Sequence, residues 1–120
     1  DRLKYNFDFA TSHSTGFFIK SVSLKRVGEF NTRYKCSADY DLYYRAIIKK
    51  KLVGISTNKN QLIGIMQSGG FSSQVSFIDH LYEETLIRLN NGQNFLWVSI
   101  IFLNAVIKNI FKIIKIYLYH

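Results

Sequence analysis

Two carboxylates, Asp39 and Asp41, stand at the start of a predicted helix, directly after a polar turn in residues 28–37. A short acidic side chain in the first helical turn is held rigidly and can be aimed into a cleft. Enzymes use such a carboxylate as a general base, because a pKa of about 4 leaves it ionised at neutral pH. The segment around Asp39 is therefore the part of the chain best suited to carry chemistry.

Each of these acidic residues also has a purely structural interpretation. Asp39 in the first turn would interact favourably with the helix dipole. Asp41 lies about 200° around the helix from Asp39, so the two side chains cannot point into one pocket. Arg45 follows Asp41 at the i+4 spacing of a helical ion pair, although it could instead reach a phosphate.

The helix that carries the aspartates has clear end signals. Ser37 is a good N-cap residue, and apolar residues recur on one side from Leu42 to Ile47. Lys49–Lys51 would close the helix with charge that suits its C-terminal dipole.

Two more helices are predicted, one before and one after this one. A brief helix over Ser21–Val27 would end at Gly28, in the role of a C-terminal glycine. A longer one would begin at a variant capping box, Ser76 with Asp79, and run to Asn90.

Several segments between these helices have the pattern of strands. Tyr5, Phe7 and Phe9 alternate with polar residues, and Ser14–Ile19 is predicted to be a short strand or an extended approach. The apolar runs 52–56 and 61–66 are predicted to be strands or extended segments, followed by a flexible loop over residues 68–73.

The C-terminal segment, residues 94–119, is predicted to be an amphipathic helix. Its uncharged run Phe95–Ile107 has thirteen residues, whereas a membrane span needs about 20. The polar residues form a single stripe at helical spacing: Asn104, Lys108, Lys112 and Lys115. This pattern suits a helix in a membrane interface, or one that packs against the rest of a larger protein, better than a full span.

Length and charge narrow the possible classes of protein. The 120 residues suffice for one compact domain or for a piece of a larger one. A formal net charge of +8 indicates an anionic partner, such as a membrane, a nucleic acid or a phosphorylated substrate. The single cysteine, Cys36, excludes an internal disulfide and a multi-cysteine zinc site within this sequence.

Four short motifs occur in a fixed order between residues 10 and 90. They are His13-Ser14, the run from Val27 to Tyr34, Ala38-Asp39-Tyr40-Asp41-Leu42 with Arg45, and Gly69-Gly70-Phe71-Ser72. In order and spacing they resemble family 2 glycosyltransferases of bacterial polysaccharide synthesis, and more narrowly the C-terminal, acceptor-side half of the catalytic domain. The resemblance implies an α/β fold, with a partial GT-A (nucleotide-diphospho-sugar transferase) domain at 1–92 and an amphipathic or membrane-interfacial helix at 93–120.

The activity that this resemblance implies is inverting transfer of a sugar from a nucleotide-sugar donor to a saccharide or lipid-linked acceptor. Asp39 matches the family's catalytic aspartate, although Ala38 replaces the glutamate that many relatives carry before it. Substrate-binding roles are expected for the remaining motif residues, which are His13, Asp41, Arg45, Gly70 and Ser72.

The resemblance also implies a divalent metal, Mg²⁺ or Mn²⁺, whose ligands are expected in a missing N-terminal, donor-binding half. Asp39-Tyr40-Asp41 spells the Asp-x-Asp of a metal site, but it opens a helix and is interpreted as the base motif. We expect this fragment to be inactive alone, and the enzyme to be cytoplasmic and peripheral at the inner face of the cell membrane.

A different class of function remains open. The chain could be a non-enzymatic basic module that binds an anionic membrane or nucleic acid. The basic residues are spread along the sequence, and Lys49–Lys51 is their one cluster, so no dedicated nucleic-acid face is evident and none is expected beyond the donor nucleotide.

Overall fold

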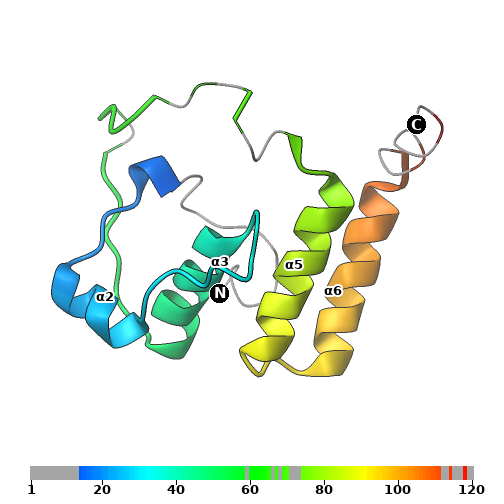
Figure 1. The fold of residues 1–120 in the computed structure, drawn as a ribbon, viewed down its shortest axis with the longest axis horizontal. Coiled ribbons are helices and arrows are strands. Elements are labelled where there is room, and N and C mark those ends of the chain that lie inside the picture. Colours follow the sequence, from blue (N-terminus) through cyan, green and yellow to red (C-terminus); the bar gives the residue numbers. More distant parts are fainter. Residues whose placement is uncertain are drawn as a thin grey trace.

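A computed structural model describes residues 14–58, 60–65, 67, 69–70, 74–111, 114 and 118. This part of the chain consists of helices joined by irregular and extended segments (Figure 1). A single 3₁₀ turn, Ser14–Gly16, precedes helix α2 (Ser21–Val27) and helix α3 (Ala38–Tyr43). The helices α5 (Phe77–Asn90) and α6 (Phe95–Lys108) follow after a long connection.

The arrangement in Figure 1 places α3 between α2 on one side and α5 on the other. The helices α5 and α6 run side by side in opposite directions, because the turn between them is only four residues long. The extended connection from the end of the α3 region to α5 passes over the top of the molecule in this view.

The predicted helix that begins after Ser37 is confirmed, but it changes character part-way. Regular α-helix ends at Tyr43, and Tyr44–Lys49 continue as a π-helix, η2. The wider turn is closed by an i→i+5 hydrogen bond of 2.9 Å from the amide of Lys50 to the carbonyl of Arg45. Lys51 then adopts a left-handed conformation with a φ of 51°, and it ends the helix.

The predictions of the helices before and after this one are also confirmed. Gly28 ends α2 with a φ of 91°, and its amide donates to the carbonyl of Leu24 over 2.8 Å. Ser76 caps α5, since its hydroxyl accepts from the amide of Asp79 over 3.1 Å. The reciprocal bond differs from the usual capping box, because the Ser76 hydroxyl donates to the Asp79 carboxylate over 2.7 Å.

The predicted C-terminal helix is confirmed over Phe95–Lys108, with Asn94 as its N-cap through a 3.2 Å bond from the amide of Trp97. Lys112 and Lys115 lie outside the described residues. In the part of the chain that the structure describes, no helix is both long enough and apolar enough to cross a membrane.

Strands are absent from the described ranges, so the α/β class stays a prediction. Tyr5, Phe7 and Phe9 lie outside those ranges. The segment 14–19 forms the 3₁₀ turn and then an irregular approach to α2. The apolar run after Lys51 has no regular secondary structure; Leu52 is partly buried, whereas Val53 and Ile55 are 95% and 98% exposed.

Two small apolar clusters hold α3 and η2 in place. The first joins Val27 of α2 to Leu42 and Ala46, with partly buried side chains of residues 19, 24, 47 and 52 around them. The second joins Tyr40 and Tyr44 to Ile87 of α5. Complete burial of an aliphatic side chain contributes about 1.5–3 kcal/mol, so these contacts fix the helix that carries Asp39 from both sides.

Candidate functional site

Asp39 lies in the first turn of α3 and is partly buried. Its Oδ1 accepts a 2.8 Å hydrogen bond from the backbone amide of the next residue, Tyr40. Among the residues that the structure describes, no second group hydrogen-bonds this carboxylate. The Tyr40 amide therefore orients the side chain, while the other oxygen remains able to accept a proton.

A second carboxylate, Glu84 of α5, interacts electrostatically with Asp39 across the contact between the two helices. Burial raises the pKa of Glu84 to about 7, and the negative charge of Asp39 adds to this effect. The positive charge of the Arg88 guanidinium, one helical turn further along α5, acts in the opposite direction and lowers the pKa of Glu84. The α3–α5 contact thus pairs an oriented aspartate with a carboxyl group that exchanges protons near neutral pH.

Tyr43 completes the surroundings of Asp39 on its own helix. Burial raises the pKa of the Tyr43 phenol to about 12, and the charge of Asp39 contributes to the same shift. The Tyr43 ring packs against Phe17 with a centroid distance of 4.3 Å. Tyr43 therefore remains a neutral phenol one helical turn after the aspartate.

The backbone just before α3 is bound by Glu83 of α5, and not by the predicted cap Ser37. One Glu83 oxygen accepts from the amide of Lys35 over 2.8 Å. The other accepts from the amides of Cys36 and Ser37 over 3.0 and 2.9 Å. The Ser37 side chain makes no capping bond, while its own amide is bound by Glu83, a residue 46 positions further along the chain.

These bonds also set the ionisation of Glu83 and Cys36. Partial burial would raise the pKa of Glu83, but the bonds from residues 35–37 outweigh it, and the pKa is lowered overall. Burial, together with the bond to Glu83, raises the pKa of the Cys36 thiol to about 11. Cys36 is therefore protonated at neutral pH and unsuited to nucleophilic chemistry, as its isolation in the sequence suggests.

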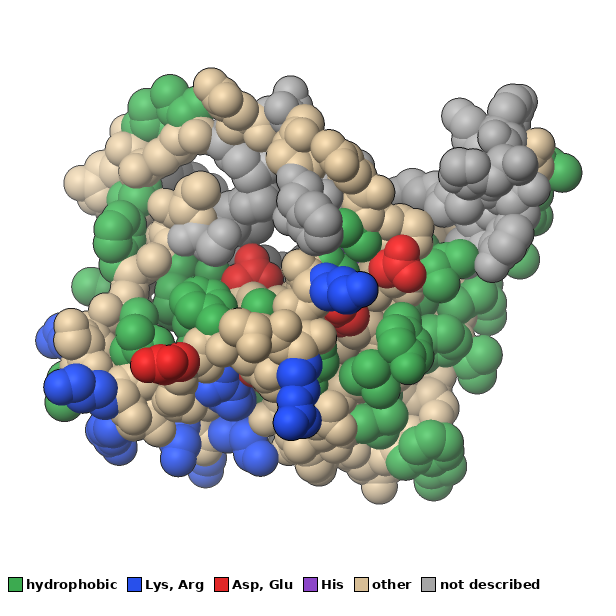
Figure 2. Space-filling view, viewed as in Figure 1, with side chains coloured by type: hydrophobic (Ala, Val, Ile, Leu, Met, Phe, Trp, Pro, Cys, Tyr) green, Lys and Arg blue, Asp and Glu red, His purple; other side chains and the backbone are tan. Residues whose placement is uncertain are grey.

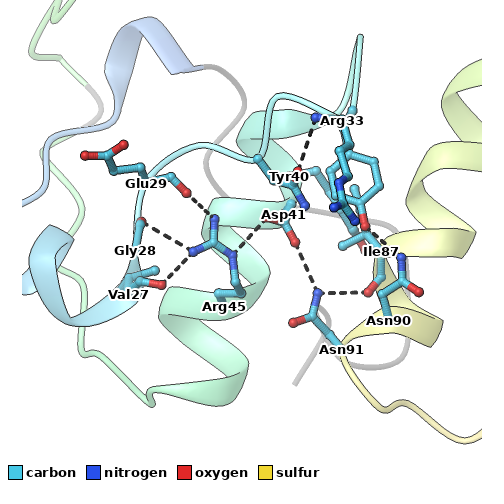
Figure 3. A network of polar contacts seen from close by, with 12 residues as sticks. Val27, Gly28, Glu29, Arg33, Tyr40, Asp41, Arg45, Ile87, Asn90 and Asn91 are labelled. Atoms are coloured by element: carbon cyan, nitrogen blue, oxygen red, sulfur yellow. Dashed lines mark hydrogen bonds and ion pairs between the residues drawn. The ribbon is translucent and has the colours of Figure 1, made fainter.

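Asp41 and Arg45 form the predicted i,i+4 ion pair, with 2.9 Å between Arg45 Nε and Asp41 Oδ2 (Figure 3). Arg45 also donates to three consecutive backbone carbonyls at the end of α2, those of Val27, Gly28 and Glu29, over 2.6, 3.3 and 2.7 Å. The second Asp41 oxygen accepts from the Asn91 amide group over 3.2 Å.

This network holds α2, α3 and the end of α5 together, and Asp41 is only 3% exposed. Asp41 and Arg45 line an open hollow of about 430 Å³, together with Arg33, Tyr34 and Asn90. Asp39 is not among the residues lining that hollow. Substrate binding by Asp41 or Arg45 stays a prediction, and it would require these side chains to give up bonds that fix the fold.

The other predicted site residues are distributed differently. His13 and Ser72 lie outside the described residues. Gly70 is exposed, and a side chain at this position would meet no atom within 4 Å. The neighbouring Gly69 has a φ of 95°, so the backbone itself favours glycine at the first position of the pair.

The described residues contain no candidate metal site. No group of three or more His, Cys, Asp or Glu side chains there could hold an ion. The divalent metal remains an expectation of the resemblance alone, with its ligands expected elsewhere.

Comparisons with known proteins leave the chain unassigned. No family model, curated protein or solved structure matches it. The motifs in the sequence and the geometry around Asp39 are therefore the observations on which a function can be argued.

Glu84 is the residue of this site that the sequence reasoning missed. The adjacent pair Glu83-Glu84 in the middle of a predicted amphipathic helix was the available signal. On an isolated helix both would be expected to face solvent, whereas the packing of α5 on α3 brings Glu83 to the backbone before α3 and partly buries Glu84.

Proposed function

We propose that this chain is the acceptor-side part of an inverting family 2 glycosyltransferase, acting in cell-surface polysaccharide assembly, with Asp39 as the general base. The observation that supports this proposal most directly is the environment of the Asp39 side chain. It is oriented through Oδ1 by the Tyr40 amide, it is neither fully exposed nor enclosed in the core, and it keeps one oxygen for a proton. This is what a base requires.

In the proposed reaction, the acceptor hydroxyl oxygen attacks the anomeric carbon of the donor sugar, and its proton passes to the free carboxylate oxygen of Asp39. The bond from the anomeric carbon to the nucleoside diphosphate breaks, and the diphosphate leaves with the electron pair. Charge stabilisation of that leaving group is what a bound divalent metal would supply. No step is assigned to a metal on the residues described here.

Glu84 supports this assignment through its position beside Asp39. A carboxyl group with a pKa of about 7 is partly neutral when the enzyme works, which limits repulsion between the two acids.

The exposed apolar residues of α6 support a peripheral membrane location and a lipid-linked acceptor. Leu96, Ile100 and Leu103 are 71%, 55% and 57% exposed. Moving these water-exposed apolar side chains into a membrane interface lowers the free energy of the system.

The test is Asp39→Asn in the full-length protein, assayed for sugar transfer and for binding of the nucleotide-sugar donor. We expect turnover to fall about 10²–10⁴-fold, which is the contribution typical of a general base, with donor binding nearly unchanged. Asp79→Asn is the matched control, because Asp79 is also a first-turn acid and its amide replacement can still accept a bond. Retained turnover in Asp39→Asn would remove Asp39 from this role.

A further inference from the structure

The fold brings together basic residues that the sequence keeps apart. Lys25 and Arg26 lie in the last turn of α2, and Lys49, Lys50 and Lys51 lie at the end of η2. The two segments are joined through the first apolar cluster and through the bonds from Arg45 to the end of α2. Figure 2 shows Lys and Arg side chains gathered at the lower left, the region that α2 and the end of η2 occupy in Figure 1.

We define this basic surface as the exposed side chains on these two segments, with the residue that precedes α2 included: Lys20, Lys25, Arg26, Lys49, Lys50 and Lys51. Neither 20–28 nor 44–52 contains an acidic residue. None of the six side chains forms an ion pair with another residue in the described part of the chain. Their positive charge is therefore not neutralised by the described part of the chain.

Lys51 adds an independent observation. Its φ of 51° is a left-handed conformation that glycine adopts without cost and that other L-residues adopt at a cost of about 1–2 kcal/mol. The backbone thus favours glycine where the chain carries a lysine. The helix end that it forms therefore does not account for a lysine at this position.

We propose that the basic surface docks the protein on an anionic membrane, with the lysine and arginine side chains against lipid phosphates. Two features favour lipid over nucleic acid. The segments 20–28 and 44–52 contain no Asn or Gln, and their one aromatic residue, Tyr44, is 3% exposed, so these segments offer no aromatic ring on which a base could stack. Instead Val22 and Val53, which are 65% and 95% exposed, flank the charges and can enter the headgroup layer.

This inference does not rest on the transferase proposal, because it concerns a surface that excludes Asp39 and a readout without catalysis. It also differs from attachment through α6, whose exposed residues are apolar. The charge of the lipid distinguishes attachment through the basic surface from attachment through α6. Each basic side chain near an anionic surface strengthens binding about five-fold, whereas binding through an apolar face does not depend on headgroup charge.

The experiment is co-sedimentation of the full chain with vesicles of phosphatidylcholine alone or mixed with phosphatidylserine. We expect binding that requires phosphatidylserine and weakens with salt. The double variants Lys25→Gln/Arg26→Gln and Lys49→Gln/Lys50→Gln should each lose about 25-fold in affinity. The matched control is Arg33→Gln/Lys35→Gln, which removes two exposed charges from the loop before α3 and should bind nearly as the wild type does.

Three results would overturn the proposal. The first is equal binding to vesicles without phosphatidylserine, which would assign attachment to an apolar face. The second is an equal loss in the control and in the surface variants, which would mean that only net charge matters. The third is tighter binding to an oligonucleotide than to the charged vesicles at the same salt concentration. Circular dichroism of each variant verifies that the helices are retained.

Discussion

The carboxylate of Glu83 accepts a 2.9 Å hydrogen bond from the backbone amide of Ser37, so a side chain of α5 caps the start of α3. The amides of the two preceding residues bind the same carboxylate. Three consecutive N–H groups just before the helix that carries Asp39 are satisfied in this way, and the position of that aspartate depends on α5.

Replacing Glu83 by glutamine should destabilise the fold by about 2 kcal/mol. The variant keeps one oxygen acceptor but loses the charge that strengthens bonds from three amides, and charge-assisted bonds are worth about 1.5–3 kcal/mol. Chemical denaturation measures the change. Glu29→Gln, which removes an exposed acid, is the control and should lie near the wild type.

The same bond has a pH signature. The folded-state pKa of Glu83 is below its ordinary value of 4.5, so its stabilisation is complete above about pH 4.5 and is lost as pH falls through the lowered folded-state pKa. The stability difference between wild type and Glu83→Gln should therefore narrow in acid. A difference that stays constant down to pH 3 would contradict this account.

Glu84 should give the opposite pH dependence. Its folded-state pKa of about 7 lies above the ordinary 4.5, so ionisation is opposed by the fold, and stability falls as pH rises from about 4.5 to about 7. Glu84→Gln should remove this fall and exceed the wild type by about 2–3 kcal/mol at pH 8. Urea denaturation at pH 5 and pH 8 makes the comparison, and an equal gain at both values would contradict it.

Arg45→Lys should destabilise the chain by about 2–4 kcal/mol. Lysine keeps the positive charge but cannot bind Asp41 and three backbone carbonyls at once. The loss should appear as lower stability and as faster hydrogen exchange of the amides in α2. Lys49→Arg is the control, since it makes the reverse exchange on an exposed residue of the same helix.

Lys51→Gly should raise stability by about 1 kcal/mol while it weakens vesicle binding. Glycine relieves the left-handed backbone and removes one charge of the basic surface. Lys50→Gly is the matched control, because Lys50 has a φ of −91° and gains nothing from glycine. It should lose both stability and binding, and equal stability changes in the two variants would contradict the proposed strain.

Most helices could be predicted from the sequence because their end signals are local. Gly28 ends α2, Ser76 caps α5, and Asp41 reaches Arg45 one turn away, as the spacing indicated. Each of these depends on residues within a few positions of one another. Helical periodicity and short-range hydrogen bonds fix them before any tertiary contact forms.

The predicted single helix after Ser37 was incomplete for a different reason. Tyr40 and Tyr44, at i,i+4 spacing, share the face that packs on Ile87, whereas the change from α3 to the π-helix at Tyr44 has no signal of its own in the sequence. No propensity within residues 38–51 distinguishes the π-helix from a continued α-helix. The predicted strands depend on partners, because a strand is stable only when another strand pairs with it.

The sequence by itself determined which residues could do chemistry at the start of α3, and where the helices begin and end, because those features come from side-chain type and local spacing. Only the tertiary structure decided that Glu83 binds the backbone before α3, that the charge of Asp39 acts on Glu84, and that Arg45 is held by three carbonyls at the end of α2. It also decided that lysines about 25 positions apart share one surface. These are long-range relationships, and they exist only once burial of Leu42 and Ile87 has brought the helices together.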